Sequence, residues 1–195
     1  VPEYAGQIAG LLESLSIAKV RVVAHSFGGR VAVYLASHRP EMVEQMVLTG
    51  AAGIRKPLTE TQKKRQARFK RMNAILNALK RLRLLRAMVE RWQAAFRRRY
   101  GSADYARLNE NMRRTFSKVI SQDLYPFLKD IQAPTLLVWG SEDTETPLWM
   151  GEQMEKAIPD AGLVVFEGRT HFAFIEEWQR FLTIVRQFFW GGQTA

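Results

Sequence analysis

The sequence of 195 residues contains no cysteine. This absence excludes disulfide bonds, thiolate metal sites and a cysteine nucleophile, and it is typical of the reducing cytoplasm, where we expect the protein to be. No apolar stretch approaches the roughly 20 residues that a transmembrane helix needs. The first residues carry Glu3 and Glu13 and no basic segment before an apolar run, unlike a signal peptide. A composition of 47% hydrophobic and 25% charged residues then indicates a soluble globular protein.

Acidic residues are scarce in one part of the chain. Between Arg55 and Lys118 there are 20 Lys and Arg but 4 Asp and Glu, a net charge of +16. The rest holds 9 basic and 15 acidic residues, a net charge of −6, so the overall charge of +10 comes from this segment. Apolar residues recur there at helical spacing from Phe69 to Met88. We therefore predict a basic helical insert at residues 54–123.

Outside the insert, strand-like and helix-like segments alternate, with short links between them. The apolar, partly β-branched runs typical of strands are Val20–His25, Val43–Thr49, Thr135–Trp139 and Gly162–Phe166. The segments with helical periodicity are Tyr4–Leu15, Gly28–His38, Pro147–Ile158 and Glu176–Trp190. This alternation predicts an α/β fold in which helices flank a parallel sheet.

The stretch Val20–Arg30 combines a strand, a very sharp turn and a helix. His25-Ser26-Phe27-Gly28 leaves no room for an ordinary loop, so Ser26 is expected at the turn with its side chain exposed at the carboxyl end of the strand. Such a turn needs small residues on both sides, and Ala24 and Gly28 meet that need.

Two later loops follow strands whose carboxyl ends are expected at the same edge of the sheet. The first, Gly140–Pro147, offers three acids, and spacing alone does not choose among Glu142, Asp143 and Glu145. The second, Gly168–Phe172, carries His171. The other two histidines suit structural roles better, because His38 ends a helix and His25 flanks the turn.

The serine turn, the stretch LLVWGSEDTETP and the stretch EGRTHFAFIEE follow one another in the order serine, acid, histidine. This order resembles the α/β-hydrolase superfamily, with Ala24 in place of the first glycine of its G-x-S-x-G elbow. The resemblance implies Ser26 as nucleophile, His171 as base, Asp143 as the acid and the backbone N–H of Phe27 as an oxyanion donor. It further implies a core at 1–53 and 124–195 and a cap at 54–123.

The resemblance implies a serine hydrolase of small carboxylic esters or related acyl compounds, with no metal or organic cofactor. Ser26 excludes the relatives that use an aspartate nucleophile. Carbon–carbon bond hydrolases and cofactor-free haloperoxidases of the same fold keep the serine triad, so the substrate stays open.

The superfamily has further strands before the elbow, and a loop after one of them, often carrying His-Gly, supplies a second oxyanion donor. Nothing before Val20 matches that segment. We therefore expect this chain to be the C-terminal portion of a longer protein, with the elbow strand at an exposed edge. The activity of the portion alone is left open, because losing one oxyanion donor costs roughly 2.7 to 4 kcal/mol.

A second hypothesis concerns the basic insert. Aromatic residues among its charges, Trp92, Phe96 and Tyr100, suit an interaction protein that binds an anionic surface. Membrane lipid headgroups fit this hypothesis better than nucleic acid, because no nucleic-acid motif accompanies the charges. The two hypotheses are compatible, since a basic cap could attract a membrane-embedded or anionic substrate.

Overall fold

The computed structural model describes residues 1–55 and 110–191, together with scattered positions between 60 and 74. The chain divides into two compact units, Val1–Arg55 with Gln122–Ala195, and Lys56–Ser121. The second unit contains α6 (Glu110–Ser121), and the stretch with Trp92, Phe96 and Tyr100 lies outside the described residues. The assignment of 54–123 as a cap therefore stays a prediction.

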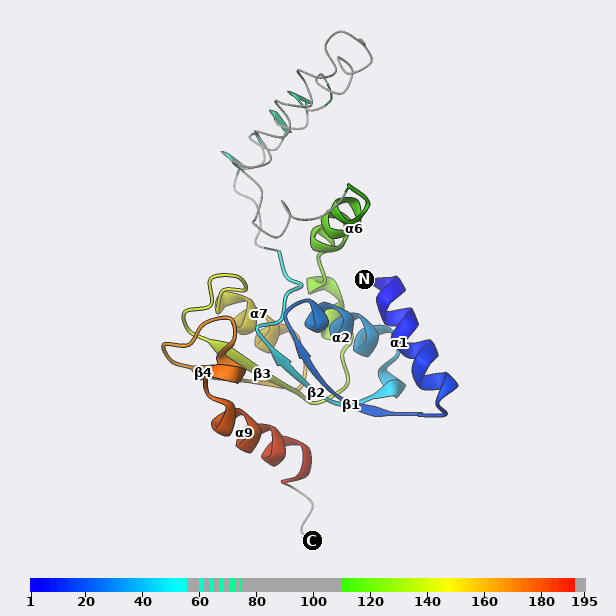
Figure 1. The fold of residues 1–195 in the computed structure, drawn as a ribbon, viewed down its shortest axis with the longest axis vertical. Helices are drawn as coiled ribbons and strands as arrows, with labels where there is room; N and C mark the ends of the chain where they lie inside the picture. The colour runs from blue at the N-terminus through cyan, green and yellow to red at the C-terminus, as the bar shows by residue number, and fades with distance from the viewer. Residues whose placement is uncertain are drawn as a thin grey trace. The chain divides into compact units, whose positions relative to one another are not determined.

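A four-stranded parallel sheet forms the centre of the first unit (Figure 1). Its strands lie in the order of the sequence: β1 (Val20–His25), β2 (Val43–Thr49), β3 (Thr135–Gly140) and β4 (Ala161–Phe166). Each pair of neighbours is parallel, so all four carboxyl ends meet at one edge. The α/β fold class predicted from the sequence is confirmed.

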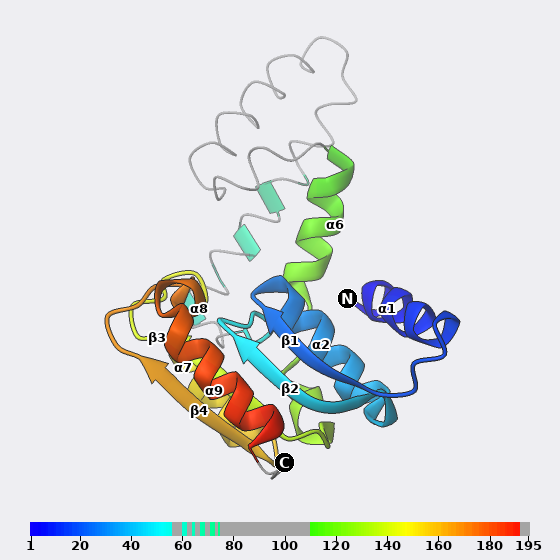
Figure 2. The same cartoon turned by 60° about the horizontal axis from the view of Figure 1, so that its bottom comes forward.

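Helices cover both faces of this sheet, and Figure 2 shows α2 on one side and α9 on the other. The helical segments on the first side are α1 (Pro2–Ser14), α2 (Phe27–His38), η2 (Tyr125–Asp130) and α7 (Trp149–Ala157). On the second side lie α8 (Ala173–Glu176) and α9 (Trp178–Trp190). A short helix, η1 (Pro40–Met42), leads from α2 into β2.

Strand β3 shows why the sequence folds into two layers of helix around a sheet. Side chains alternate between faces along a strand. Leu137 and Trp139 accordingly belong to the core under α2 and α7, whereas Leu136 and Val138 belong to the core under α9. Every residue of β3 is buried, as its continuous apolar run predicted.

The C-terminal helix differs from its prediction as one helix from Glu176. It is broken at Glu177, whose φ of −124° and ψ of 49° are not helical. The Glu177 carboxylate accepts hydrogen bonds from Arg169 at 2.8 Å and from Arg180 at 3.2 Å. These contacts tie the chain after β4 to the start of α9, and hydrophobic periodicity does not report them.

Helix α1 packs through its small residues. Ala5 and Ala9 are buried, whereas Ile8 and Leu11 are exposed, as is Leu15 directly after the helix. An apolar groove of about 350 Å³ lies among α1, α2 and β1. Among the described strands β1 has a neighbour on one side only, which agrees with the expected exposed edge. Of the helices that the structure describes, none has both the length and the apolar composition needed to cross a bilayer.

Candidate active site

Ser26 lies between the last residue of β1 and the first residue of α2. Its φ of 49° and ψ of −112° belong to a strained backbone that a non-glycine residue rarely adopts. The Ser26 N–H donates to the Thr49 carbonyl at 3.1 Å, and the Ser26 carbonyl accepts from Gly29 and Ala52. Ser26 is half-buried, and among the residues that the structure describes its hydroxyl makes no hydrogen bond, to His171 or to any other. The turn is thus fixed by backbone contacts while the hydroxyl is left available.

The close approach at this turn lies at Gly29. A Cβ at Gly29 would stand 2.4 Å from the Ala51 Cβ, nearer than two carbon atoms can approach. A Cβ at Gly28, the small neighbour that the sequence pattern singled out, would lie 3.7 Å from the Ala24 Cβ, an ordinary contact. Glycine is therefore needed at position 29, because Ala51 in the loop after β2 lies so close. The elbow motif does not include that loop.

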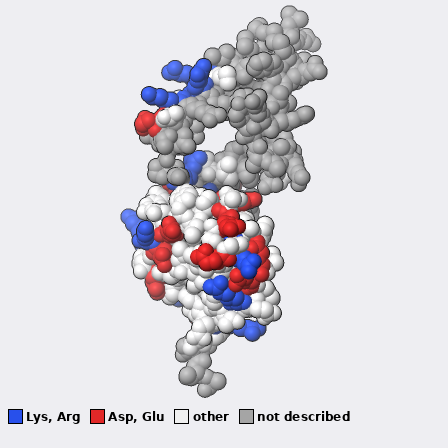
Figure 3. All heavy atoms as spheres, turned by 90° about the vertical axis from the view of Figure 1, so that its left-hand side faces the viewer, with Lys and Arg blue, Asp and Glu red and all other residues white. Residues whose placement is uncertain are grey.

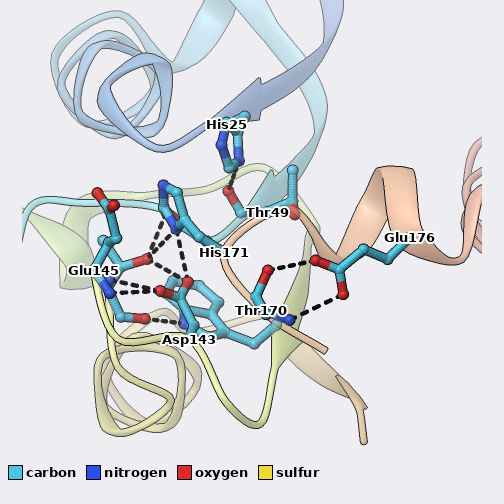
Figure 4. Close-up of polar contacts among 10 residues, drawn as sticks. His25, Thr49, Asp143, Glu145, Thr170, His171 and Glu176 are labelled. Carbon is cyan, nitrogen blue, oxygen red and sulfur yellow. Dashed lines mark hydrogen bonds and ion pairs between the residues drawn. The ribbon is translucent and has the colours of Figure 1, made fainter. Parts of the chain in front are cut away.

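His171 and Asp143 form a buried pair at the carboxyl edge of the sheet (Figure 4). The His171 Nδ1–H donates to Asp143 Oδ2 at 2.8 Å, and the two residues are 8% and 4% exposed. Glu142 and Glu145, which spacing had left as alternatives, are exposed. Asp143 is therefore the acid of this loop that holds the imidazole.

Thr146 and Gly50 complete the surroundings of this pair, and sequence reasoning missed both. The Thr146 hydroxyl lies 2.7 Å from Asp143 Oδ2, 2.9 Å from the Gly50 carbonyl oxygen and 3.1 Å from His171 Nδ1. Gly50 has a φ of 49°, and a Cβ there would come within 3.1 Å of His171 Nδ1. Gly50 could have been found from the sequence, because it directly follows a strand that ends at this edge. Nothing in the sequence pointed to Thr146.

The loop that carries His171 is braced on both sides. Thr170 donates to the Glu176 carboxylate through its hydroxyl and its N–H (Figure 4). Arg169 pairs with Glu177. The Glu142 N–H donates to the Arg169 carbonyl at 2.9 Å, which joins this loop to the acid loop. These contacts hold the backbone of the histidine loop, in addition to the bond that the His171 side chain makes with Asp143.

The ring of His25 brings the elbow and His171 together. Its centroid lies 4.6 Å from that of His171, and its Nδ1–H donates to the Thr49 carbonyl at 3.0 Å. Burial lowers the pKa of His25, and the neighbouring His171 lowers it further, against the opposing effects of the Thr49 carbonyl and Asp143. Because His25 directly precedes Ser26, this contact puts His171 beside the elbow.

The remaining histidine, His38, is a helix-end residue. Its ring stacks on Tyr34 at 3.9 Å and its Nδ1–H donates to the Tyr34 carbonyl at 3.0 Å. Within residues 1–55, 110–191 and the described positions of the second unit, no three His, Asp or Glu side chains gather as metal ligands.

A sequence model of the alpha/beta hydrolase fold matches residues 2–177. The match covers most of the chain and includes the elbow, the acid loop and the histidine loop. The chain belongs to the α/β-hydrolase family, as its motifs suggested.

Named relatives in this family act on small molecules. The chain is 30% identical to a 2-hydroxymuconate semialdehyde hydrolase of Pseudomonas putida, with 92% of this chain and 65% of that protein covered. It is 31% identical to a 2-hydroxy-6-oxononadienedioate/2-hydroxy-6-oxononatrienedioate hydrolase of Burkholderia vietnamiensis, with 93% and 66% covered. An uncharacterized protein of Mycobacterium tuberculosis is 26% identical, and the chain spans 61% of its length. The chain thus corresponds to about two thirds of these relatives.

Solved structures of α/β hydrolases also superpose on nearly the whole of this chain but are themselves only partly covered by it. A meta-cleavage product hydrolase of Pseudomonas fluorescens superposes with a TM-score of 0.62 and 26% identity, and the superposition covers 96% of this chain and 71% of that one. An α/β hydrolase from a deep-sea metagenome gives a TM-score of 0.65 at 22% identity, which supports the fold alone.

Proposed function

We propose that this chain carries the catalytic triad of a serine hydrolase, with Ser26 as nucleophile, His171 as general base and Asp143 as the group that orients His171. The observation that carries the proposal is the buried 2.8 Å bond between His171 Nδ1 and Asp143 Oδ2, beside a serine held in a strained turn. This bond leaves Nε2 as the imidazole nitrogen that can accept a proton.

The chemistry requires these three residue types. A serine hydroxyl is a weak nucleophile at neutral pH, so His171 Nε2 takes the proton of Ser26 Oγ as Oγ attacks the substrate carbonyl carbon. Asp143 stabilises the imidazolium that forms. The backbone N–H of Phe27, in the first turn of α2, donates to the oxyanion. His171 then returns the proton to the leaving group, and water attacks the acyl-enzyme by the same route.

The substrate is a small acyl compound in this proposal. Carboxylic esters are the first candidate, because the triad forms an acyl-enzyme from any carbonyl with a suitable leaving group. The second candidate is carbon–carbon bond hydrolysis, which the names of the relatives favour, since 2-hydroxymuconate semialdehyde hydrolase and the meta-cleavage product hydrolase belong to the same family.

A substrate panel tests this function. Esters of increasing acyl length and 2-hydroxymuconate semialdehyde are offered to the chain and to Ser26→Ala, and hydrolysis is followed by absorbance. We expect Ser26→Ala to lose at least about 10³-fold in kcat for any substrate that is turned over. Ser16→Ala is the matched control, because Ser16 also has a positive φ, of 58°, but is exposed and precedes β1, whereas Ser26 follows it. Turnover that persists in Ser26→Ala contradicts the proposal.

Binding to an anionic surface through the basic insert stays a prediction, since most of that insert lies outside the described residues. On the visible face of the first unit, acidic and basic side chains lie near one another and form no uniformly basic patch (Figure 3). The residues outside 55–118 carry a net charge of −6, so any salt-dependent attraction to anionic vesicles is expected to come from residues 55–118.

A further inference from the structure

The Asp143 carboxylate is surrounded by donors although it is buried. Its Oδ1 accepts the N–H groups of Glu145 at 2.9 Å and Thr146 at 2.8 Å. Its Oδ2 accepts His171 Nδ1–H at 2.8 Å and lies 2.7 Å from the Thr146 hydroxyl. A carboxylate has about four acceptor positions. The Thr146 hydroxyl therefore fills the position that the backbone and His171 leave over.

The Thr146 hydroxyl has one hydrogen and two oxygens to receive it. Besides Asp143 Oδ2 it lies 2.9 Å from the Gly50 carbonyl oxygen, at the end of β2. The hydroxyl hydrogen is therefore shared between these two acceptors, and the same oxygen lies 3.1 Å from His171 Nδ1. Thr146 thus contacts the loops after β2, β3 and β4 with a single atom.

The backbone of Thr146 is held as firmly as its side chain. Its carbonyl accepts the indole N–H of Trp139 at 2.6 Å, and Trp139 is fully buried in β3. Thr146 itself is 5% exposed. The hydroxyl is therefore fixed by the sheet, which is the support that a site needs to keep a reacting group within a fraction of an ångström.

We propose that Thr146 is a positioning residue of the site: its hydroxyl bridges Asp143 Oδ2 and the Gly50 carbonyl and so fixes the direction from which Asp143 holds His171. This inference rests on the proposed function, because it assigns a role in the reaction of Ser26 and His171. Without the hydroxyl, the carboxylate loses one of four hydrogen bonds in a buried place, where an unmade bond is costly. Asp143 and the ring of His171 then turn away from the reactive arrangement.

Kinetics of three variants test the role. Thr146→Val replaces the hydroxyl with a methyl, and we expect kcat to fall by about tenfold or more with KM changed less than about twofold. Thr146→Ser keeps the hydroxyl and is expected to recover kcat to within about threefold of the original chain. Thr144→Val, two residues away and exposed, is the matched control and is expected to leave kcat unchanged. Equal values of kcat for Thr146→Val and Thr144→Val overturn the inference.

NMR spectroscopy tests the role of Thr146 without a substrate. The chain has three histidines, so the imidazole signals in nitrogen-edited NMR are few. In the Ser26→Ala background we expect the hydrogen-bonded Nδ1–H signal of His171 to shift or broaden with Thr146→Val and to keep its position with Thr146→Ser. An unchanged signal in the valine variant overturns the inference.

The outcomes separate the inference from the function on which it rests. Hydrolysis that survives Ser26→Ala removes the proposed function, whatever the Thr146 variants do. Hydrolysis that depends on Ser26 but not on the Thr146 hydroxyl removes the inference alone. If Thr146→Val fails to fold by circular dichroism, Thr146→Ala is measured in its place, because it removes the hydroxyl without a methyl near the two oxygens.

Discussion

His25 is the residue at which the turn, the imidazole of His171 and the core under α9 meet. Its ring lies 4.6 Å from His171 on one side and 4.8 Å from Phe174 on another. The sequence placed His25 directly before Ser26 and indicated a structural role. The tilted ring contact with His171 could not be predicted, because it depends on how the loops at this sheet edge pack against one another.

Protonation of His25 is expected to make stability depend on pH. Burial lowers its pKa in the folded chain, and the neighbouring His171 acts in the same direction, whereas Thr49 and Asp143 oppose them. The unfolded chain therefore binds a proton more readily, so the stabilising contribution of neutral His25 is present above about pH 6.5 and is lost as the pH falls below it.

Urea unfolding measured across this pH range checks this expectation. The ordinary pKa of a histidine is about 6.5. Between about pH 7 and pH 5 we therefore expect the free energy of unfolding to decline less for His25→Phe than for the original chain. His38→Phe is the control, because His38 is exposed at the end of α2. Parallel curves for the original chain and His25→Phe contradict the expected titration.

At the scale of elements, local patterns predicted the strands and most helices because burial repeats with the period of each element. Strand β3 is buried on both faces and its run is continuously apolar. The break at Glu177 and the bridge through Thr146 were not predicted, because both depend on side chains that meet across loops. The order of the motifs along the chain predicted Ser26, Asp143 and His171. The contacts that their neighbours Gly50 and Thr146 make could be identified only from the register between strands, which places the loops side by side.

The crossing of α2 over the loop after β2 is expected to tolerate no side chain at Gly29. A methyl there would meet the Ala51 Cβ at 2.4 Å and its Cα at 3.0 Å, so Gly29→Ala should lower the free energy of unfolding by about 1 to 3 kcal/mol. Gly28→Ala is the matched control. It lies on the same helix with an ordinary contact of 3.7 Å, and helix propensity offsets its effect to within about 1 kcal/mol.

Chemical denaturation of the two variants side by side decides the question. A larger loss for Gly29→Ala than for Gly28→Ala supports the close crossing. Equal losses contradict it, because the two substitutions differ only in what the added methyl meets.

At the scale of the whole molecule, the site is assembled from three loops that are far apart in sequence and adjacent at one sheet edge. The second feature at this scale is apolar surface: the groove among α1, α2 and β1 has almost no polar lining, and Val23 on the edge strand is 52% exposed. An unpaired strand edge favours association with other chains. Activity and stability measurements on this chain therefore belong at low protein concentration.

Labelling with a fluorophosphonate, followed by proteolysis and mass spectrometry of the modified peptide, tests most directly whether Ser26 is the nucleophile that His171 and Asp143 activate. We predict one adduct, on the peptide that contains Ser26, which vanishes in Ser26→Ala and weakens sharply in His171→Ala. An adduct on another residue, or labelling that persists in Ser26→Ala, contradicts Ser26 as the nucleophile.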